Sequence, residues 1–324
     1  MSSIAILGEA LIDLQVVDGA EPMEEGRPAA RIYTAQPGGS PFNVAIGLAR
    51  LGHRAEFVGR LAQDALGGVL RRHAEQSGVS LRWSGSWPGP TPAALFDLED
   101  DGSARYEFHL GDARETLFSA ADAAALDPSA LDAVHFGSIA SWLAGSAEAV
   151  LATATRLRED GVFVSYDPNV RATLAEDRES TLRQMNQATD ISDLIKASAE
   201  DLAWLHPGVS IAQTAQEWLN RGVSAVVVTH GAAGADCYTA NAVLHGRSAP
   251  VGVVDTVGAG DAFMAGLLDG LAGVDALSRE GLSKLLVRPA DVQHLLNVAC
   301  AHAAATCTRP GADPPWRSLA SASS

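Results

Sequence analysis

Residues 254 to 263 read Val-Asp-Thr-Val-Gly-Ala-Gly-Asp-Ala-Phe and lead directly into an apolar, helix-forming run, Met264–Leu271. A Gly-Ala-Gly turn that enters a helix leaves the first backbone N–H groups without partners and free of bulky side chains. Together with the helix dipole, those amides form a site for a phosphoryl oxygen. Asp261 follows in the first turn, where the dipole favours its ionised form, so it can accept a proton from a hydroxyl. Taken alone, the stretch fits an N-capping aspartate after a flexible turn equally well.

A second glycine-containing stretch, Gln-Pro-Gly-Gly-Ser-Pro-Phe-Asn-Val-Ala, occupies residues 36 to 45. The paired Gly38 and Gly39 let the backbone approach a ligand closely, and Asn43 offers both a donor and an acceptor to hydroxyl groups. By itself, this stretch favours a turn followed by a helix cap.

The composition of the 324-residue chain excludes several classes of protein. It has 23 Lys and Arg against 39 Asp and Glu, a formal net charge of −16, and 47% of its residues are apolar. Such a chain buries a sizeable core, which argues against disorder. Its acidity argues against a nucleic-acid partner, because phosphate backbones require clustered Lys and Arg.

Cysteine usage and the N-terminus indicate where the protein works. Three cysteines without a Cys-x-x-Cys spacing fit a reducing compartment rather than a disulfide framework. The chain starts on a strand-like run without a basic segment, which argues against a signal peptide, and no apolar run is suited to a membrane span. We therefore expect a cytoplasmic protein without a membrane partner.

Apolar runs alternate with amphipathic stretches along most of the chain. Short runs that are apolar on both faces predict buried strands at Ile4–Leu7, Ala133–Phe136, Val162–Tyr166, Asp193–Ile195 and Ala225–Thr229. Helices are predicted at Asn43–Leu51, Leu66–Ser77, Ser146–Glu159, Thr181–Ala188, Ile211–Arg221, Ala262–Leu271 and Pro289–Thr306. This order predicts an α/β fold with a mostly parallel sheet that is covered on both faces.

Two regions interrupt the alternation. Residues 11–18 with 31–35, and residues 92–99 with 105–110, alternate apolar and polar side chains around turns, which predicts half-exposed antiparallel strands. They would form a small sheet inserted into the α/β core at about residues 11–36 and 91–112. An exposed sheet face suits a lid or a homodimer contact. Residues 316–324 are expected to form a tail.

Four blocks of sequence occur in one order: Gly38-Gly39 with Asn43, then Gly-Arg-Leu-Ala-Gln-Asp-Ala-Leu-Gly at 59–67, Asp-Pro-Asn-Val-Arg at 167–171, and Asp255 to Asp261. In this combination they resemble the ribokinase-like (PfkB) family of sugar kinases over about residues 4–315. Three further segments look most like its fructokinase branch: Gly-Glu-Ala-Leu-Ile-Asp at 8–13, His-Phe-Gly-Ser at 135–138 and Lys-Ala-Ser-Ala-Glu-Asp at 196–201. The resemblance implies a three-layer α/β/α sandwich in one kinase domain, residues 1–315, with the inserted strands as a lid.

For catalysis, the resemblance implies transfer of the ATP γ-phosphate to a hydroxyl of a free sugar, with fructose as the favoured substrate. Asp261 would be the general base, and the amides of Gly258, Ala259 and Gly260 would hold the charge on the transferred group.

The resemblance also implies the binding residues. The sugar would be held by Asp13, Gly38, Gly39, Asn43, Asn169 and Arg171. ATP, with Mg²⁺, would lie against Lys196, Ser198, Thr229, Gly231, Gly234 and Cys300. A monovalent cation such as K⁺ would bind backbone oxygens of the two loops that carry Asp255, Val257, Thr306, Arg309 and Gly311.

The chain departs from the family pattern at three places. Ser198 and Asp201 replace a frequent Asn-x-x-Glu near the phosphates, although the fructokinase branch also tends to have serine there. Cys300 replaces an asparagine on the adenine side, which leaves the contact with the base unassigned. Leu110 stands where a lid arginine is common, with Arg105 and Arg114 nearby, and this leaves the sugar open because arginine is the natural clamp for a carboxylate.

Other functions remain as alternatives. Within the family, the substrate alternatives are 2-keto-3-deoxygluconate, ribose or a nucleoside, for which Tyr33, Phe96 and Phe108 are the aromatic candidates on the lid. A different class would be a catalytically idle sugar-binding regulator, against which the intact Asp261 argues. A dinucleotide-dependent oxidoreductase fails on spacing, because no G-x-G-x-x-G follows the first strand.

Overall fold

The computed structural model describes residues 1–16, 32–98, 104–111, 117–175 and 177–317. Its largest element is an eight-stranded sheet in the order β14-β13-β12-β11-β10-β9-β1-β4. The strands are β1 (Ser3–Leu7), β4 (Arg54–Val58), β9 (Ala133–Gly137), β10 (Phe163–Asp167), β11 (Leu194–Ser198), β12 (Ala225–Thr229), β13 (Ala235–Tyr238) and β14 (Val243–Gly246). The six strands from β12 to β4 run parallel, and β13 and β14 add an antiparallel edge.

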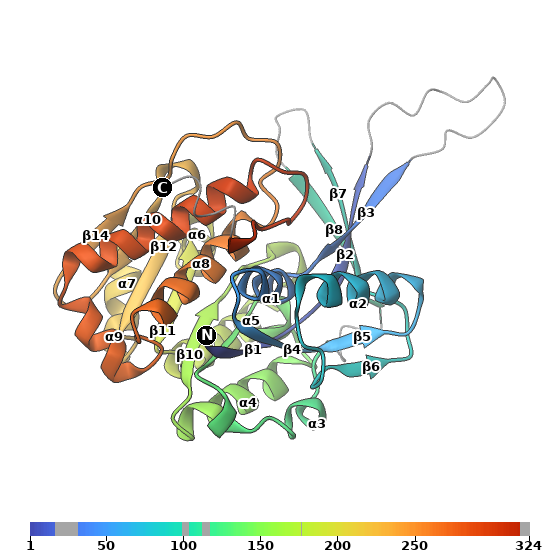
Figure 1. Cartoon of the computed structure of the whole chain (residues 1–324), viewed down its shortest axis with the longest axis horizontal. Coiled ribbons are helices and arrows are strands. Elements are labelled where there is room, and N and C mark those ends of the chain that lie inside the picture. The colour runs from blue at the N-terminus through green and yellow to red at the C-terminus, as the bar shows by residue number, and fades with distance from the viewer. Residues whose placement is uncertain (17–31, 99–103, 112–116, 176, 318–324) are drawn as a thin grey trace.

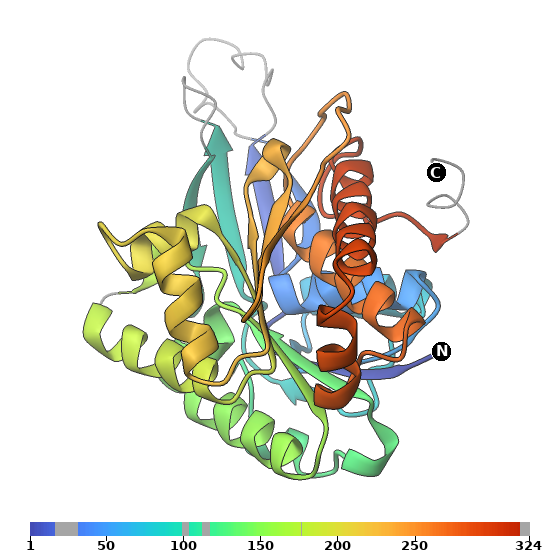
Figure 2. The same cartoon turned by 90° about the vertical axis from the view of Figure 1, so that its left-hand side faces the viewer.

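Helices cover both faces of this sheet, as Figures 1 and 2 show. One layer contains α1 (Ser40–Arg50), α2 (Ala65–Ser77), α8 (Ala259–Gly273), α9 (Arg279–Leu286) and α10 (Pro289–Thr306). The other contains α3 (Ala120–Ala123), α4 (Ala147–Glu159), α5 (Arg178–Asp190), α6 (Ala199–Leu205) and α7 (Ile211–Asn220).

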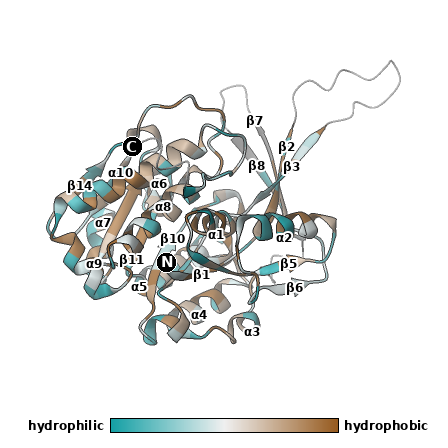
Figure 3. Ribbon diagram, viewed as in Figure 1, coloured by the Kyte–Doolittle hydropathy of each residue, from teal (hydrophilic) through white to brown (hydrophobic). Residues whose placement is uncertain are grey.

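The two layers follow from the alternation of side chains along buried strands. On β1, Ile4 and Ile6 belong to the apolar core under α1 and α8, whereas Ala5 and Leu7 belong to the core under α4 and α7. All four side chains are fully buried. In Figure 3 the buried strand β12 is brown along most of its length, while the outer helix α2 carries both teal and brown. The predicted α/β fold with a mostly parallel sheet is therefore confirmed.

A small four-stranded sheet, β3-β2-β7-β8, stands away from the central sheet in Figure 1. It consists of β2 (Leu11–Val16), β3 (Tyr33–Gly38), β7 (Ala93–Leu98) and β8 (Ala104–His109). Its two outer pairs are antiparallel, as predicted, but β2 and β7 pair in parallel. Both hairpins extend from the central sheet in the same direction with their first strands side by side, so β2 and β7 run parallel. A separate pair, β5 (Arg60–Ala62) and β6 (Gly85–Trp87), lies beside α2.

Several observed elements are not among the predicted ones. Strands β13 and β14 and helix α9 are short and carry mixed polar and apolar residues, so their periodicity is weak. In the predicted tail, Trp316 packs against the Arg50 guanidinium, and Arg317 donates to the carbonyl oxygen of Leu51 at 2.5 Å. Residues 318–324 lie outside the described part of the chain.

None of the described helices has the length and apolar character that a membrane crossing requires.

Candidate active site

The carboxyl ends of neighbouring parallel strands bring several polar side chains to one edge of the central sheet. Glu9 follows β1, Ser138 follows β9, and Asn169 and Arg171 follow β10. Because β10, β9 and β1 are adjacent and parallel, these segments emerge side by side. In open α/β sheets, ligands bind at this edge.

Helices α1 and α8 bring their N-terminal turns to the same edge, and Asp261 lies where they meet. Ser40 Oγ donates to Asp261 Oδ1 at 2.7 Å, and Asn43 Nδ2 donates to Asp261 Oδ2 at 2.8 Å. All three side chains are buried. Two donors therefore fix the orientation of the carboxyl group, while each oxygen keeps a lone pair for a further hydrogen bond.

The turn before α8 has no room for a side chain at Gly258 and little at Gly260. Gly258 has a φ of +74°, and a Cβ at this position would lie 2.5 Å from Ala312 Cβ. A Cβ on Gly260 would lie 3.0 Å from Lys196 Nζ. The first amides of α8 are thus open to an anion, with a cationic side chain beside them.

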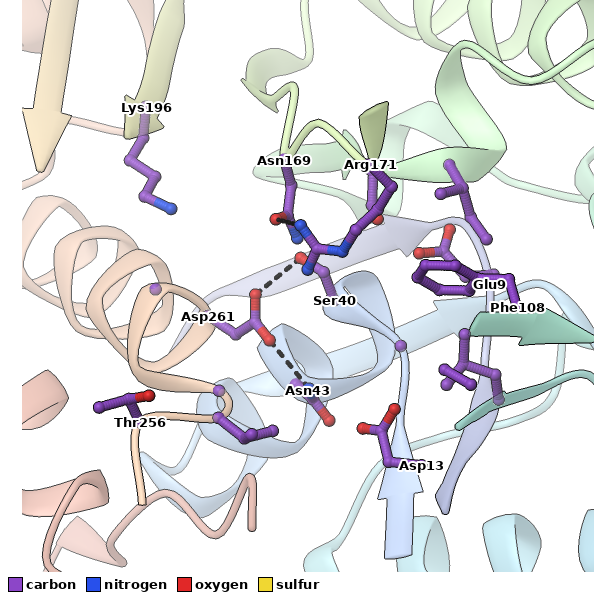
Figure 4. A pocket seen from close by; sticks show the side chains of 18 residues that line it. Glu9, Asp13, Ser40, Asn43, Phe108, Asn169, Arg171, Lys196, Thr256 and Asp261 are labelled. Atoms are coloured by element: carbon purple, nitrogen blue, oxygen red, sulfur yellow. Dashed lines mark hydrogen bonds between the residues drawn. The ribbon is translucent and has the colours of Figure 1, made fainter. Parts of the chain in front are cut away.

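These groups surround one pocket of about 200 Å³ (Figure 4). Among the residues predicted from the sequence, its lining includes Asp13, Gly39, Asn43, Asn169, Arg171, Lys196, Val257, Gly258, Gly260 and Asp261. Gly38 and Ala259 are not part of the lining but adjoin it. A Cβ on Gly38 would lie 2.1 Å from Asp13 Oδ2, so this glycine leaves room for the Asp13 carboxyl group.

Asp13 and Arg171 supply opposite charges at the end of the pocket away from Lys196 (Figure 4). Burial raises the pKa of Asp13 to about 7, with Arg171 acting in the opposite direction. The Arg171 guanidinium is oriented by Asn169 Oδ1, which accepts from its Nη1 at 2.7 Å. A carboxyl group and an oriented guanidinium can together bind vicinal hydroxyls.

Lys196 is tied to Asp167 in a buried ion pair. Its Nζ lies 2.7 Å from Asp167 Oδ2, and both side chains are less than a tenth exposed. Burial opposes the ammonium charge, but the Asp167, Asp201 and Asp261 carboxylates outweigh it and raise the pKa of Lys196. Burial in turn raises the pKa of Asp167 to about 6. Lys196 therefore remains a cation next to the N-terminus of α8.

The other residues predicted to contact ATP lie outside this pocket. Ser198 caps α6: its Oγ donates to Asp201 Oδ2 at 2.8 Å and accepts from Asp201 N at 3.0 Å. The loop with Thr229, Gly231 and Gly234 follows β12, where His230 N donates to the Gly234 carbonyl at 2.8 Å. Cys300, on α10, belongs to the apolar core and is 3% exposed. Their contacts with ATP remain predictions.

The two loops of the predicted cation site lie side by side. Gly311 N donates to Asp255 Oδ2 at 2.8 Å, and the amides of residues 254 and 255 both donate to the Cys307 carbonyl. Arg309 pairs with Asp313, and Thr306 is fully buried. Among the described residues, no group of three His, Cys, Asp or Glu side chains is arranged to hold a metal ion. A site built from backbone carbonyls, as predicted, needs no such group.

The structure adds site residues that the sequence patterns do not single out. Ser40 and Glu9 stand inside the quoted motifs, yet their roles depend on partners far away in the chain. Among the described side chains of the small sheet, Phe108 is an aromatic one that lines the pocket, whereas Tyr33 is 39% exposed. Leu110 is buried in the core. The side chains of Phe96, Arg105 and Arg114 lie outside the described part of the structure.

Comparisons with known proteins agree with this geometry. Residues 1–319 match the family model described as pfkB family carbohydrate kinase. The chain is 33% identical over 272 residues to a fructokinase of Klebsiella pneumoniae, which covers 83% of this chain and 84% of that one. It is similar to the crystal structure of a Xylella fastidiosa fructokinase with bound ATP, with a TM-score of 0.86, 26% identity and coverage of 99% and 97%. A Vibrio cholerae fructokinase with fructose, ADP and calcium ion aligns with a TM-score of 0.79, 26% identity and coverage of 96% and 94%.

Proposed function

The chain belongs to the pfkB family of carbohydrate kinases and is an ATP-dependent carbohydrate kinase, and from this premise we propose that it phosphorylates a primary hydroxyl of free fructose with Asp261 as the general base. The observation that carries the proposal is the position of Asp261 in the first turn of α8, held by Ser40 and Asn43 and open to the pocket.

In the proposed reaction, Asp261 accepts the proton of the sugar hydroxyl as its oxygen forms a bond to the γ-phosphorus of ATP. The bond between that phosphorus and the β–γ bridging oxygen breaks, and ADP leaves with the electron pair. The amides of Gly258, Ala259 and Gly260 would stabilise the charge on the transferred group, with Lys196 beside them. Positioning and electrostatics supply most of the catalysis in phosphoryl transfer.

The charges of the pocket favour a neutral sugar over a sugar acid. Asp13 and Glu9 contribute carboxyl groups, and the contribution of the small sheet includes the apolar Leu11, Ala94 and Phe108. A substrate carboxylate would meet apolar surface and two carboxyl groups there, which repel it whenever they are ionised, although Arg171 would attract it. Fructose is the neutral sugar proposed, because similar proteins are named fructokinases.

The metal ions belong to this proposal as well. Magnesium in kinases is held by one or two carboxylates together with the substrate phosphates, so it needs no cage of protein ligands. When bound, it would neutralise charge on the ATP phosphates. The adjacent Asp255 and Gly311 loops would offer carbonyl oxygens to a monovalent cation such as K⁺. We further propose that the small sheet closes over the sugar as a lid and excludes water.

The proposal is tested by ADP release from ATP with Mg²⁺ across fructose, ribose, 2-keto-3-deoxygluconate, glucose, adenosine and fructose 1-phosphate. We expect a strong response to fructose that the Asp261→Asn variant loses. A stronger response to another compound would replace fructose as the substrate. No response to any compound, with sugar binding still measurable by calorimetry, would favour a sugar-binding regulator over an enzyme.

A further inference from the structure

Glu9 is a buried carboxyl group in the pocket to which the proposed reaction assigns no role. It follows β1, its side chain is 1% exposed, and it lines the pocket together with Asp13 and Arg171. Leaving a carboxyl group in such a place is costly unless it is hydrogen-bonded or has a ligand. In Figure 4 it lies on the side of the pocket away from Lys196, beyond the Arg171 guanidinium.

The contacts of Glu9 run to a strained turn at the end of β9. Ala140 N donates to Glu9 Oε2 at 3.1 Å, and the Ser138 side chain also interacts with the carboxyl group. Ser138 has a φ of +53° and a ψ of −159°, a backbone conformation that residues other than glycine rarely adopt. Such strain persists only where the surroundings enforce it, and it clusters at functional sites.

The strained turn is part of the pocket wall, since both Ser138 and Ile139 line the pocket. Two further bonds hold it: Ser138 N donates to the Asp167 carbonyl at 2.9 Å, and Ser141 Oγ donates to the Ser138 carbonyl at 2.7 Å. Glu9 therefore connects the pocket ends of β1 and β9.

The carboxyl group keeps acceptor capacity beyond these contacts. In its charged form, which Arg171 favours, the carboxyl group offers about four lone-pair sites, more than the turn uses. Arg171 lies close enough to favour the charged form of both Glu9 and Asp13. This end of the pocket thus presents two carboxyl groups and one guanidinium to whatever part of the substrate is remote from Asp261.

We propose that Glu9 is a sugar-binding residue, whose carboxyl group holds the Ser138–Ala140 turn and hydrogen-bonds a sugar hydroxyl at the end of the pocket remote from Asp261. The inference rests on the proposed function, because it assigns a residue to a sugar in this pocket. It makes Glu9 a determinant of which hydroxyl pattern the kinase accepts.

The test pairs Glu9→Gln with monodeoxy sugars, using calorimetry in the presence of a non-hydrolysable ATP analogue. For the wild type, we expect one deoxy analogue that lacks a non-reacting hydroxyl to bind about tenfold more weakly than the parent sugar. In Glu9→Gln, the parent sugar should bind about tenfold more weakly, and the penalty for that one analogue should shrink to less than about threefold. Penalties for the other analogues should stay as they are in the wild type.

A merely structural role would look different. If Glu9 only supports the turn, the variant will bind the parent sugar and every analogue more weakly by one common factor. This outcome would overturn the proposal. Unchanged sugar binding would overturn it as well. Steady-state kinetics give a second readout: we expect the sugar KM to rise, with kcat and the ATP KM within about threefold of the wild type.

Glu56→Gln is the matched control. Glu56, on β4, is also a 1% exposed glutamate, but it pairs with Arg54 and Arg82 outside the pocket. It should alter stability and leave every sugar affinity within about threefold of the wild type. The deoxy series follows the sugar that the wild type phosphorylates in the panel above. Failure of the proposed function would therefore appear as a wild type that releases no ADP with any sugar of the panel. Failure of the role of Glu9 would appear as a uniform change, or no change, in the sugar affinities of Glu9→Gln.

Discussion

The residues around Asp261 share one pocket, whereas most residues predicted to contact ATP lie apart from one another. Around Asp261, side chains from α1, α8, the small sheet and the ends of β1, β9 and β10 meet in one pocket. Apart from Lys196, which lines that pocket, the predicted ATP residues are spread out: Ser198 caps α6, the Thr229 loop follows β12, and Cys300 lies in the core under α10.

This difference reflects the chemistry of the two ligands. Recognition of a sugar and removal of its proton require side-chain carboxylates, amides and a guanidinium at fixed places, so these groups are assembled before the ligand arrives. Nucleotide phosphates are held largely by backbone amides, which many sequences can supply. We therefore expect substitutions near Asp261 to have large and specific effects, and substitutions on the predicted ATP side to have small ones.

The largest expected effect comes from Asp261→Asn, which removes the proposed base while keeping its shape. Turnover should fall by about 10²-fold to 10⁴-fold, the range of a lost general base. ADP release at saturating ATP and sugar measures this. Asp269→Asn, on the same helix, is the control, because its carboxylate bonds His53 and an arginine outside the pocket. A turnover within tenfold of the wild type in Asp261→Asn would contradict the role of this residue.

The second effect is on stability and comes from Glu9. Burial raises the pKa of this carboxyl group from 4.5 to about 7 in the folded protein. The folded state then holds a proton that the unfolded chain releases. The contribution of Glu9 to the free energy of unfolding is therefore fully present below about pH 4.5 and is lost as the pH rises through about 7. Between pH 5 and 8, the free energy of unfolding of the wild type should fall by about 2 to 3 kcal/mol relative to that of Glu9→Gln.

Urea unfolding of both proteins at pH 5 and pH 8 measures that difference, and other titrating groups cancel in the comparison. A difference between the two proteins that does not change with pH would show that Glu9 is charged throughout, in conflict with its burial.

The third effect concerns sugar affinity. Asp13→Ala removes a carboxyl group that faces the pocket, so the sugar KM should rise about tenfold to 100-fold, the size of one or two hydrogen bonds to a charged group. The ATP KM should stay within about threefold. Asp122→Ala, which removes the partner of Arg60 outside the pocket, is the control. Equal weakening of sugar and ATP would show that the sugar site is misplaced.

The smallest effect is expected on the predicted ATP side. Cys300→Ala should change the ATP KM by less than about threefold, since the side chain is 3% exposed and packs in the core. Cys237→Ala is matched to it in residue type, exposure and core, and lies on β13. An ATP KM that rises tenfold in Cys300→Ala alone would remove the contrast between the two regions.

Much of the fold and part of the pocket can be predicted from the sequence. The parallel strands are short runs that are apolar on both faces, and the glycines before Asp261 stand where a side chain would collide, so both leave a local trace. The family resemblance is confirmed. Ser40 and Glu9 leave no such trace, because their roles depend on partners 221 and 131 residues away. The edge strands β13 and β14 are too short for a clear period.

Other predictions depend on features that a sequence pattern does not contain. Backbone carbonyls for a monovalent cation are common to every residue, so the proximity of Asp255 and Gly311 appears only in the fold. Leu110 stands at the sequence position of the common lid arginine, but its side chain is buried in the core and does not line the pocket. A homodimer through the small sheet remains a prediction.

The most direct test of the account combines two measurements on one preparation of Asp261→Asn: calorimetric binding of fructose and the rate of ADP release. We predict a dissociation constant within about threefold of the wild type and turnover below about 1% of it, because the base acts on a sugar that other residues hold. Loss of binding together with turnover would contradict the account, since Asp261 would then be a sugar-binding or structural residue.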